Sequence, residues 1–176
     1  MAVVKIDFCK KGRNERKLAK ENIKYMENRP GKDKAKIQRA LFTAYGQVTR
    51  LQGYEMVNQA GEGSTFFRIK ISPDPVKENK EHDLPMREIT KEIMALEGIL
   101  GTPVSWVAAI HDDHTQIAHV HVLAVTKARK FPAKEMIRTA TDACLEQRKE
   151  LDKALQPERE QERGGEGRIW ERERSK

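Results

Sequence analysis

Residues 104–125 read VSWVAAIHDDHTQIAHVHVLAV, two short apolar runs joined by a polar link. Runs of this length, from Val104 to His111 and from Ala118 to Val125, are typical of buried β-strands. The polar residues between the two runs favour a turn. We therefore expect these two strands to pair as an antiparallel hairpin.

The flanking sequence predicts further strands and helices. Alternation of apolar and polar residues predicts strands over residues 2–9 and 65–71. Apolar residues at helical spacing predict helices over residues 14–28, 37–45, 84–100 and 133–155, whereas residues 51–63 are poorly patterned. This order of elements predicts an α+β fold, an antiparallel sheet with the helices gathered on one face.

The chain has the length of one domain, which we place at residues 1–156. Pro157 is expected to end a long C-terminal helix. Residues 158–176 interleave six Glu with six Lys or Arg around Gly164 and Gly165, so residues 157–176 are predicted to be a flexible charged tail, either a frayed helix or disordered. Trp170 in this tail is given no role.

Positive charge is concentrated near the N-terminus. Residues 1–50 contain 14 Lys or Arg against 5 Asp or Glu, within a chain of net charge +7. Such an excess favours a polyanionic partner, although a solvated helix face would look the same. Cys9 and Cys144 form no metal-binding or disulfide pattern, and the first residues resemble neither a signal peptide nor a membrane span, so a cytoplasmic location is expected.

Histidines are concentrated in the predicted hairpin. The chain has 5 histidines, and His111, His114, His119 and His121 lie within the quoted stretch. Side chains two apart on a strand share a face, so His119 and His121 can converge on one ion, and pairing in the hairpin would bring His111 to them. Three neutral imidazoles leave coordination positions open for water or a phosphate oxygen, as catalytic metal sites require.

Other assignments around this hairpin stay open. His114 can replace His111 as the third ligand, contact DNA or have no role. Asp112 and Asp113 can orient imidazole N–H groups or be solvated turn carboxylates. A lone surface histidine would need no metal, but a strand face made of imidazoles does need partners.

The motif His119-Val120-His121, preceded by His111 at a strand end, resembles the His-hydrophobic-His metal motif of relaxases, which are HUH-type DNA nickases of conjugation and mobilisation. Asn22-Ile-Lys-Tyr25-Met resembles the nucleophile segment of that family, and Phe67-Arg-Ile-Lys-Ile-Ser72-Pro resembles another of its motifs. The resemblance covers roughly residues 2–127 and implies the ferredoxin-like sheet of the HUH endonucleases.

The order of the motifs along the chain separates subclasses of this family. Relaxases carry the catalytic tyrosine upstream of the paired histidines, and here Tyr25, Tyr45 and Tyr54 are all upstream. Tyr25 is the predicted nucleophile because positive residues that attract a phosphodiester surround it, namely Lys17, Lys20, Lys24 and Arg29. Tyr54 is the reserve nucleophile, and Tyr45 is expected to face the core.

The resemblance implies nicking and rejoining of single-stranded DNA by tyrosine transesterification. A divalent cation would assist the reaction. The working ion would be magnesium or manganese, and zinc, nickel or cobalt could also occupy the site. Other relaxosome proteins are implied as partners. Two other functions fit the sequence: a non-catalytic single-stranded DNA-binding accessory protein, and a metal-dependent phosphodiesterase that uses water.

Overall fold

The computed structural model describes residues 1–8, 14–30, 37–81, 83–112 and 118–173, with side chains to residue 155. Within these residues the elements are β1 (Val3–Phe8), α1 (Glu15–Asn28), β2 (Leu41–Thr43), β3 (Gly46–Val48), α2 (Arg50–Gln59), β4 (Thr65–Ser72), α3 (Met86–Met94), α4 (Glu97–Leu100), β5 (Val104–His111), β6 (His119–Thr126) and α5 (Ala133–Glu173). None of the described helices is both long enough and apolar enough to cross a membrane.

The strands form one six-stranded sheet in the order β1-β4-β6-β5-β2-β3. Every pair of neighbours is antiparallel. The predicted hairpin is confirmed, because β5 pairs with β6 from Val104 opposite Thr126 to His111 opposite His119. These two strands lie in the middle of the sheet.

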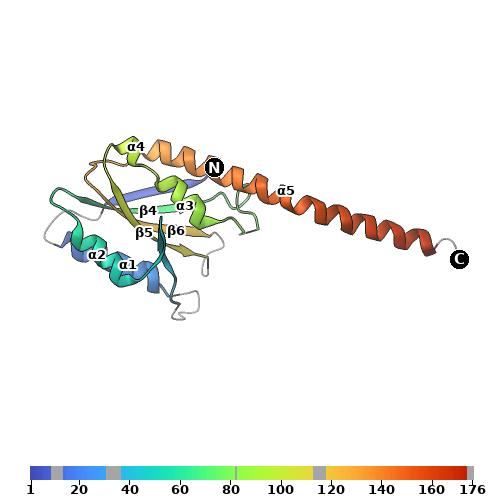
Figure 1. Cartoon of the computed structure of the whole chain (residues 1–176), viewed down its shortest axis with the longest axis horizontal. Coiled ribbons are helices and arrows are strands. Elements are labelled where there is room, and N and C mark those ends of the chain that lie inside the picture. The colour runs from blue at the N-terminus through green and yellow to red at the C-terminus, as the bar shows by residue number, and fades with distance from the viewer. Residues whose placement is uncertain (9–13, 31–36, 82, 113–117, 174–176) are drawn as a thin grey trace.

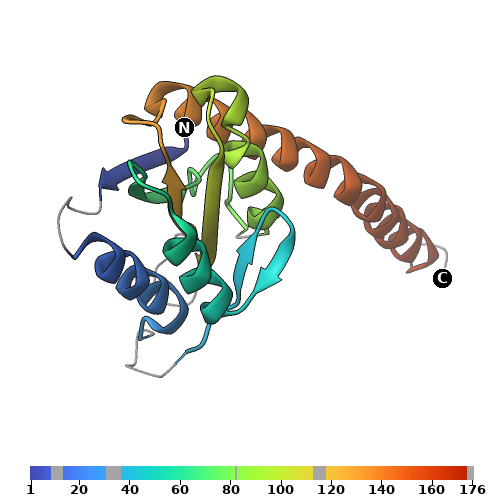
Figure 2. The ribbon, with the colours of Figure 1, turned by 60° about the vertical axis from the view of Figure 1, so that its left-hand side comes forward.

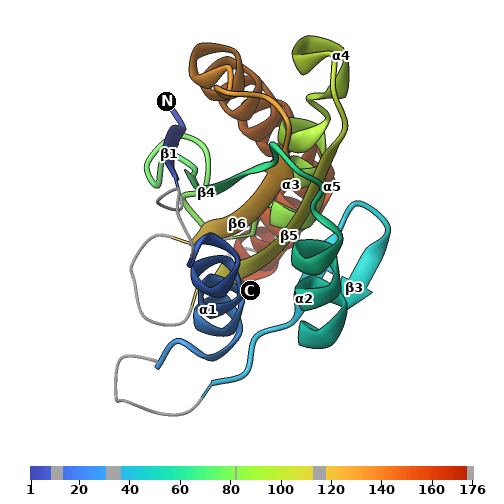
Figure 3. The same cartoon turned by 90° about the vertical axis from the view of Figure 1, so that its left-hand side faces the viewer.

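Helices cover both faces of the sheet, and the prediction that they gather on one face is wrong. Figures 1 and 3 show α1 and α2 on one side and α3 and α5 on the other. The cause lies in the central strands, which are apolar on both sides. On β6, Val120 and Val122 join the core beneath α3 and α5, whereas Leu123 and Val125 join the core beneath α1 and α2.

The helix predicted over residues 37–45 is replaced by strands β2 and β3. Leu41 packs into one core and Phe42 into the other, so two adjacent buried residues imitate helical spacing. Gly46 has a φ of +130°, a conformation that favours glycine, and it helps to turn the chain. Tyr45 is 101% exposed in this turn and does not face the core. The β2–β3 hairpin (cyan in Figure 2) lies at the edge of the sheet.

Three helix boundaries also differ from the predictions. The unpatterned segment holds α2, whose start is fixed by a capping box in which Thr49 and Gln52 bond each other's backbone N–H groups. The single helix predicted over residues 84–100 is divided into α3 and α4 at Ala95 and Leu96. Helix α5 runs past Pro157 to Glu173, through a segment rich in the good helix formers Glu, Gln and Arg, and extends away from the sheet (Figure 1).

Phe67 is expected to be a major contributor to stability. Its side chain is 0% exposed, and its ring centroid lies 4.4 Å from that of Phe131. Phe67→Ala should lower the free energy of unfolding by about 3–5 kcal/mol, because it leaves a cavity in the core beneath α5. Urea denaturation measures the change. Val76→Ala is the matched control, since Val76 is 77% exposed and its truncation should change stability by less than about 0.5 kcal/mol.

Candidate active site

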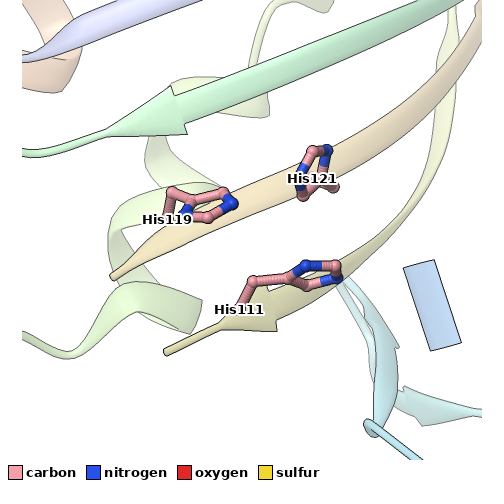
Figure 4. Close-up of side chains that lie close together, drawn as sticks. All are labelled: His111, His119 and His121. Atoms are coloured by element: carbon pink, nitrogen blue, oxygen red, sulfur yellow. The ribbon is translucent and has the colours of Figure 1, made fainter. Parts of the chain in front are cut away.

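Three histidines project from the two central strands on the face that α1 and α2 cover. His111 ends β5, and His119 and His121 are the first and third residues of β6. In the hairpin register His111 lies opposite His119, and His121 lies two residues further along the same face. Figure 4 shows the three imidazoles close together above the two strands.

The geometry of the three imidazoles fits a divalent metal ion. One ring nitrogen from each histidine lies within 4.8 Å of the other two. Nitrogens that bind one ion tetrahedrally at about 2.1 Å are about 3.4 Å apart, so the rings would have to approach one another by up to about 1.4 Å to complete the set. Nε2 of His121 is buried and has no hydrogen-bond partner among the described residues, which is the environment a metal ligand requires.

A backbone carbonyl fixes the tautomer of His111. Nε2 of His111 lies 2.9 Å from the carbonyl oxygen of Met26. Because a carbonyl oxygen only accepts, Nε2 carries the proton of the neutral ring and donates it to Met26, and the lone pair is then on Nδ1. The group that orients His111 is therefore this carbonyl of α1.

The site favours neutral imidazoles. Burial lowers the pKa of His111 to about 4, although the hydrogen bond to Met26 opposes the shift. Burial and the charges of His111, His119 and Lys70 lower the pKa of His121 to about 3. At neutral pH these two rings are therefore uncharged, the form in which histidine binds metals.

The ring of Tyr25 lies beside the histidines. Its centroid is 6.1 Å from that of His121 and 6.4 Å from that of His111. Helix α1 presents this phenol at the sheet because Ala19, Ile23 and Met26 pack beneath it as a buried stripe. Tyr25 is 44% exposed, so its ring contacts the site on one side and solvent on the other.

Tyr25 and the reserve nucleophile, Tyr54, lie in different surroundings. Tyr54 is half-buried on α2, and its ring centroid lies 5.8 Å from Nζ of Lys20. The guanidinium of Arg29 lies 5.5 Å from the Tyr25 ring centroid. Lys20 and Arg29, both predicted to contact DNA, thus lie against different tyrosines.

The remaining predicted residues lie around the site or outside the described part of the chain. Lys17 and Lys24 are exposed on α1, where they stay predicted DNA contacts. Asp112 is exposed directly after β5. Asp113 and His114 lie outside the described residues, and so does Cys9.

A cleft of about 630 Å³ opens next to Tyr25 and His121. Lys5, Arg68 and Lys70, from strands β1 and β4, give it positive charge. In the sheet register Lys5 lies opposite Lys70, and Lys70 lies opposite His121, so a row of cationic side chains leads to the metal-binding face. Such a row suits a phosphodiester strand.

Sequence reasoning missed the three cationic residues of the cleft. The alternation of β4 was visible, but it assigned no role to Arg68 and Lys70. Asp7 and Glu21 also line the cleft. The signal is that Lys5, Lys70 and His121 lie opposite one another on one face of the sheet. It follows only once the order of the strands is known.

The candidate site therefore combines a metal-binding face, a phenol and a basic cleft on one side of the sheet. Imidazole nitrogens bind divalent transition ions, and a phenol oxygen is a nucleophile for phosphoryl and acyl transfer. No family model, no curated protein and no solved structure matches this chain.

Proposed function

We propose that the protein nicks and rejoins single-stranded DNA by tyrosine transesterification. The observation that carries the proposal is the phenol ring of Tyr25 beside three converging histidines, 6.1 Å from His121 and 6.4 Å from His111. A nucleophile of this kind next to a metal-binding face points to attack on a phosphodiester rather than to metal storage.

His111, His119 and His121 would hold the divalent cation. When bound, the ion would polarise the scissile phosphate and offset the negative charge that develops on it. Magnesium or manganese is proposed as the working ion, and zinc, nickel and cobalt also suit imidazole ligands. The chain's own contribution is the neutral rings of His111 and His121, with the orientation of His111 fixed from α1.

Tyr25 would perform the covalent step. Its oxygen forms a bond to phosphorus, the bond from phosphorus to the 3′-oxygen breaks, and the proton lost by the phenol is balanced by the proton that the leaving 3′-oxygen takes up to become a hydroxyl. The product is a 5′-phosphotyrosyl strand, and the reverse attack by the 3′-hydroxyl rejoins the DNA. Because the phosphotyrosine linkage retains the energy of the broken phosphodiester bond, the reaction requires no nucleotide cofactor.

The basic cleft would hold the substrate strand. Its volume of about 630 Å³ is in the range of pockets that accept a small ligand, so unstacked nucleotides can enter it. Lys5, Arg68 and Lys70 would contact backbone phosphates, with the basic residues of α1 extending this surface. The proposed substrate is therefore single-stranded DNA.

Incubation with labelled single-stranded oligonucleotide pools and manganese tests the proposal. We expect a protein–DNA band that survives denaturation and that disappears with a chelator. DNA binding without an adduct would instead identify an accessory protein. Cleavage without an adduct would identify a phosphodiesterase that uses water.

DNA binding should weaken steeply with salt, and the cleft should account for part of this dependence. For single strands, each phosphate contact contributes about 0.7 to the slope of log affinity against log salt. Arg68→Met with Lys70→Met should therefore lower the slope by about 1.4 and weaken binding at low salt. Fluorescence anisotropy over a salt series measures both quantities.

Lys153→Met is the matched control for this charge loss. Lys153 is 70% exposed on α5, the helix on the opposite face of the sheet, and its loss should leave the slope unchanged. Salt-independent binding by the wild-type protein would rule out the phosphate contacts.

A further inference from the structure

We infer that Arg39 is a positioning residue that fixes the last turn of α1, and with it Tyr25, over the histidine site. Its effect on catalysis rests on the proposed function, whereas its effect on α1 does not. Arg39 stands in the segment before β2, ten residues after Arg29, and reaches α1 through both its backbone and its side chain.

The carbonyl groups at the end of α1 are held by residues from outside the helix. A helix leaves its last carbonyls without partners inside the helix. Met26 accepts from His111 at 2.9 Å, and Glu27 accepts from the backbone N–H of Arg39 at 2.8 Å. The guanidinium of Arg39 donates to the Arg29 carbonyl at 2.7 Å. Arg39 therefore supplies two of these three bonds.

The surroundings of Arg39 make this arrangement rigid. Arg39 is 8% exposed and Glu27 is 7% exposed, so water competes little for their hydrogen bonds. The Glu27 carboxylate accepts from Gln38 at 3.3 Å and pairs with Arg50 of α2 at 3.1 Å. A guanidinium also suits this place because its positive charge lies at the negative end of the helix dipole.

The same turn carries Tyr25. The N–H of Arg29 donates to the Tyr25 carbonyl at 2.9 Å, and the Arg29 guanidinium lies over the Tyr25 ring. A shift of this turn would move the phenol relative to His111 and His121. Misplacement of a reacting group by about 1 Å costs about 100-fold in rate.

Arg39→Met tests this role, with Arg39→Lys as the conservative variant. At saturating DNA and manganese, we expect Arg39→Met to slow adduct formation by about 10- to 100-fold, with little change in DNA affinity. Arg39→Lys should recover part of the rate, since it keeps the charge and one donor. Amide hydrogen exchange over residues 25–29, measured without DNA or metal, should be at least about tenfold faster in Arg39→Met.

Arg148→Met is the control for general destabilisation. Arg148 is also buried, at 4% exposed, and donates to the Glu78 carbonyl and to Asp83 from α5 on the opposite face. This variant should leave the adduct rate and the exchange over residues 25–29 nearly unchanged at a temperature where both proteins are folded. If Arg39→Met does not fold, the same measurements on Arg39→Lys decide the matter.

Three results would overturn the inference. The first is an equal slowing in Arg39→Met and Arg148→Met. The second is weaker DNA binding with an unchanged rate at saturation. The third is unaltered hydrogen exchange over residues 25–29. A wild-type protein that forms no adduct would refute the proposed function instead, and the exchange measurement would still decide whether Arg39 holds the turn.

Discussion

Tyr25→Phe should abolish covalent attachment of DNA while metal content and single-strand affinity stay close to those of the wild-type protein. The substitution removes one oxygen, the proposed nucleophile, and keeps the ring that lies beside His111 and His121. The metal-binding group consists of histidines alone, and Lys5, Arg68 and Lys70 of the cleft are unchanged. A denaturing gel, metal analysis and anisotropy measure the three quantities.

Tyr54→Phe and Tyr45→Phe are matched controls, since each removes the same atom elsewhere. Tyr54, on α2, lies against Lys20 of α1, and Tyr45 lies in an exposed turn. Both variants should therefore form the adduct at the wild-type rate. If Tyr25→Phe still forms the adduct and Tyr54→Phe does not, the nucleophile is Tyr54.

Replacing His119 and His121 together by alanine should remove the bound divalent ion. The wild-type protein is expected to hold one transition ion per chain after dialysis against a small excess of metal. Of the three converging histidines the double variant keeps only His111, and one imidazole cannot hold an ion against competition from water and buffer. Metal analysis after dialysis measures the content, and adduct formation should be lost in parallel.

His82→Ala provides the control for this metal experiment, because His82 is the remaining histidine of the chain and lies outside the cluster in sequence. It should leave the metal content unchanged. Unchanged metal content in the His119 and His121 double variant would contradict the assignment of the ligands.

The grouping of the histidines could be predicted from the sequence because it depends on local rules. A two-residue strand period places His119 and His121 on one face, and a hairpin brings His111 opposite them. Both conditions hold in the structure. The sequence resemblance singled out Tyr25, and the fold places its ring beside this group.

The parts that sequence reasoning missed depend on contacts between distant segments. Leu41 and Phe42 imitate a helix because their strand is buried on both faces, which local spacing cannot reveal. Lys70 lies opposite His121 because β4 pairs with β6, and the local sequence does not reveal this pairing. Arg39 is the exception in distance, since it lies only 10 to 12 residues from its partners Arg29 and Glu27, but it stands outside α1 and no periodicity marks the contact.

The core is divided into two clusters, one on each face of the sheet, so the packing of one face can be altered separately from that of the other. Along β6, adjacent residues alternate between the histidine side and the side covered by α3 and α5. Substitutions at Val120 or Ala124 would change the packing beneath α3 and α5, and neither residue lines the cleft. Such changes would act on the stability of the fold, whereas changes at His119 or His121 of the same strand would act on the histidine cluster.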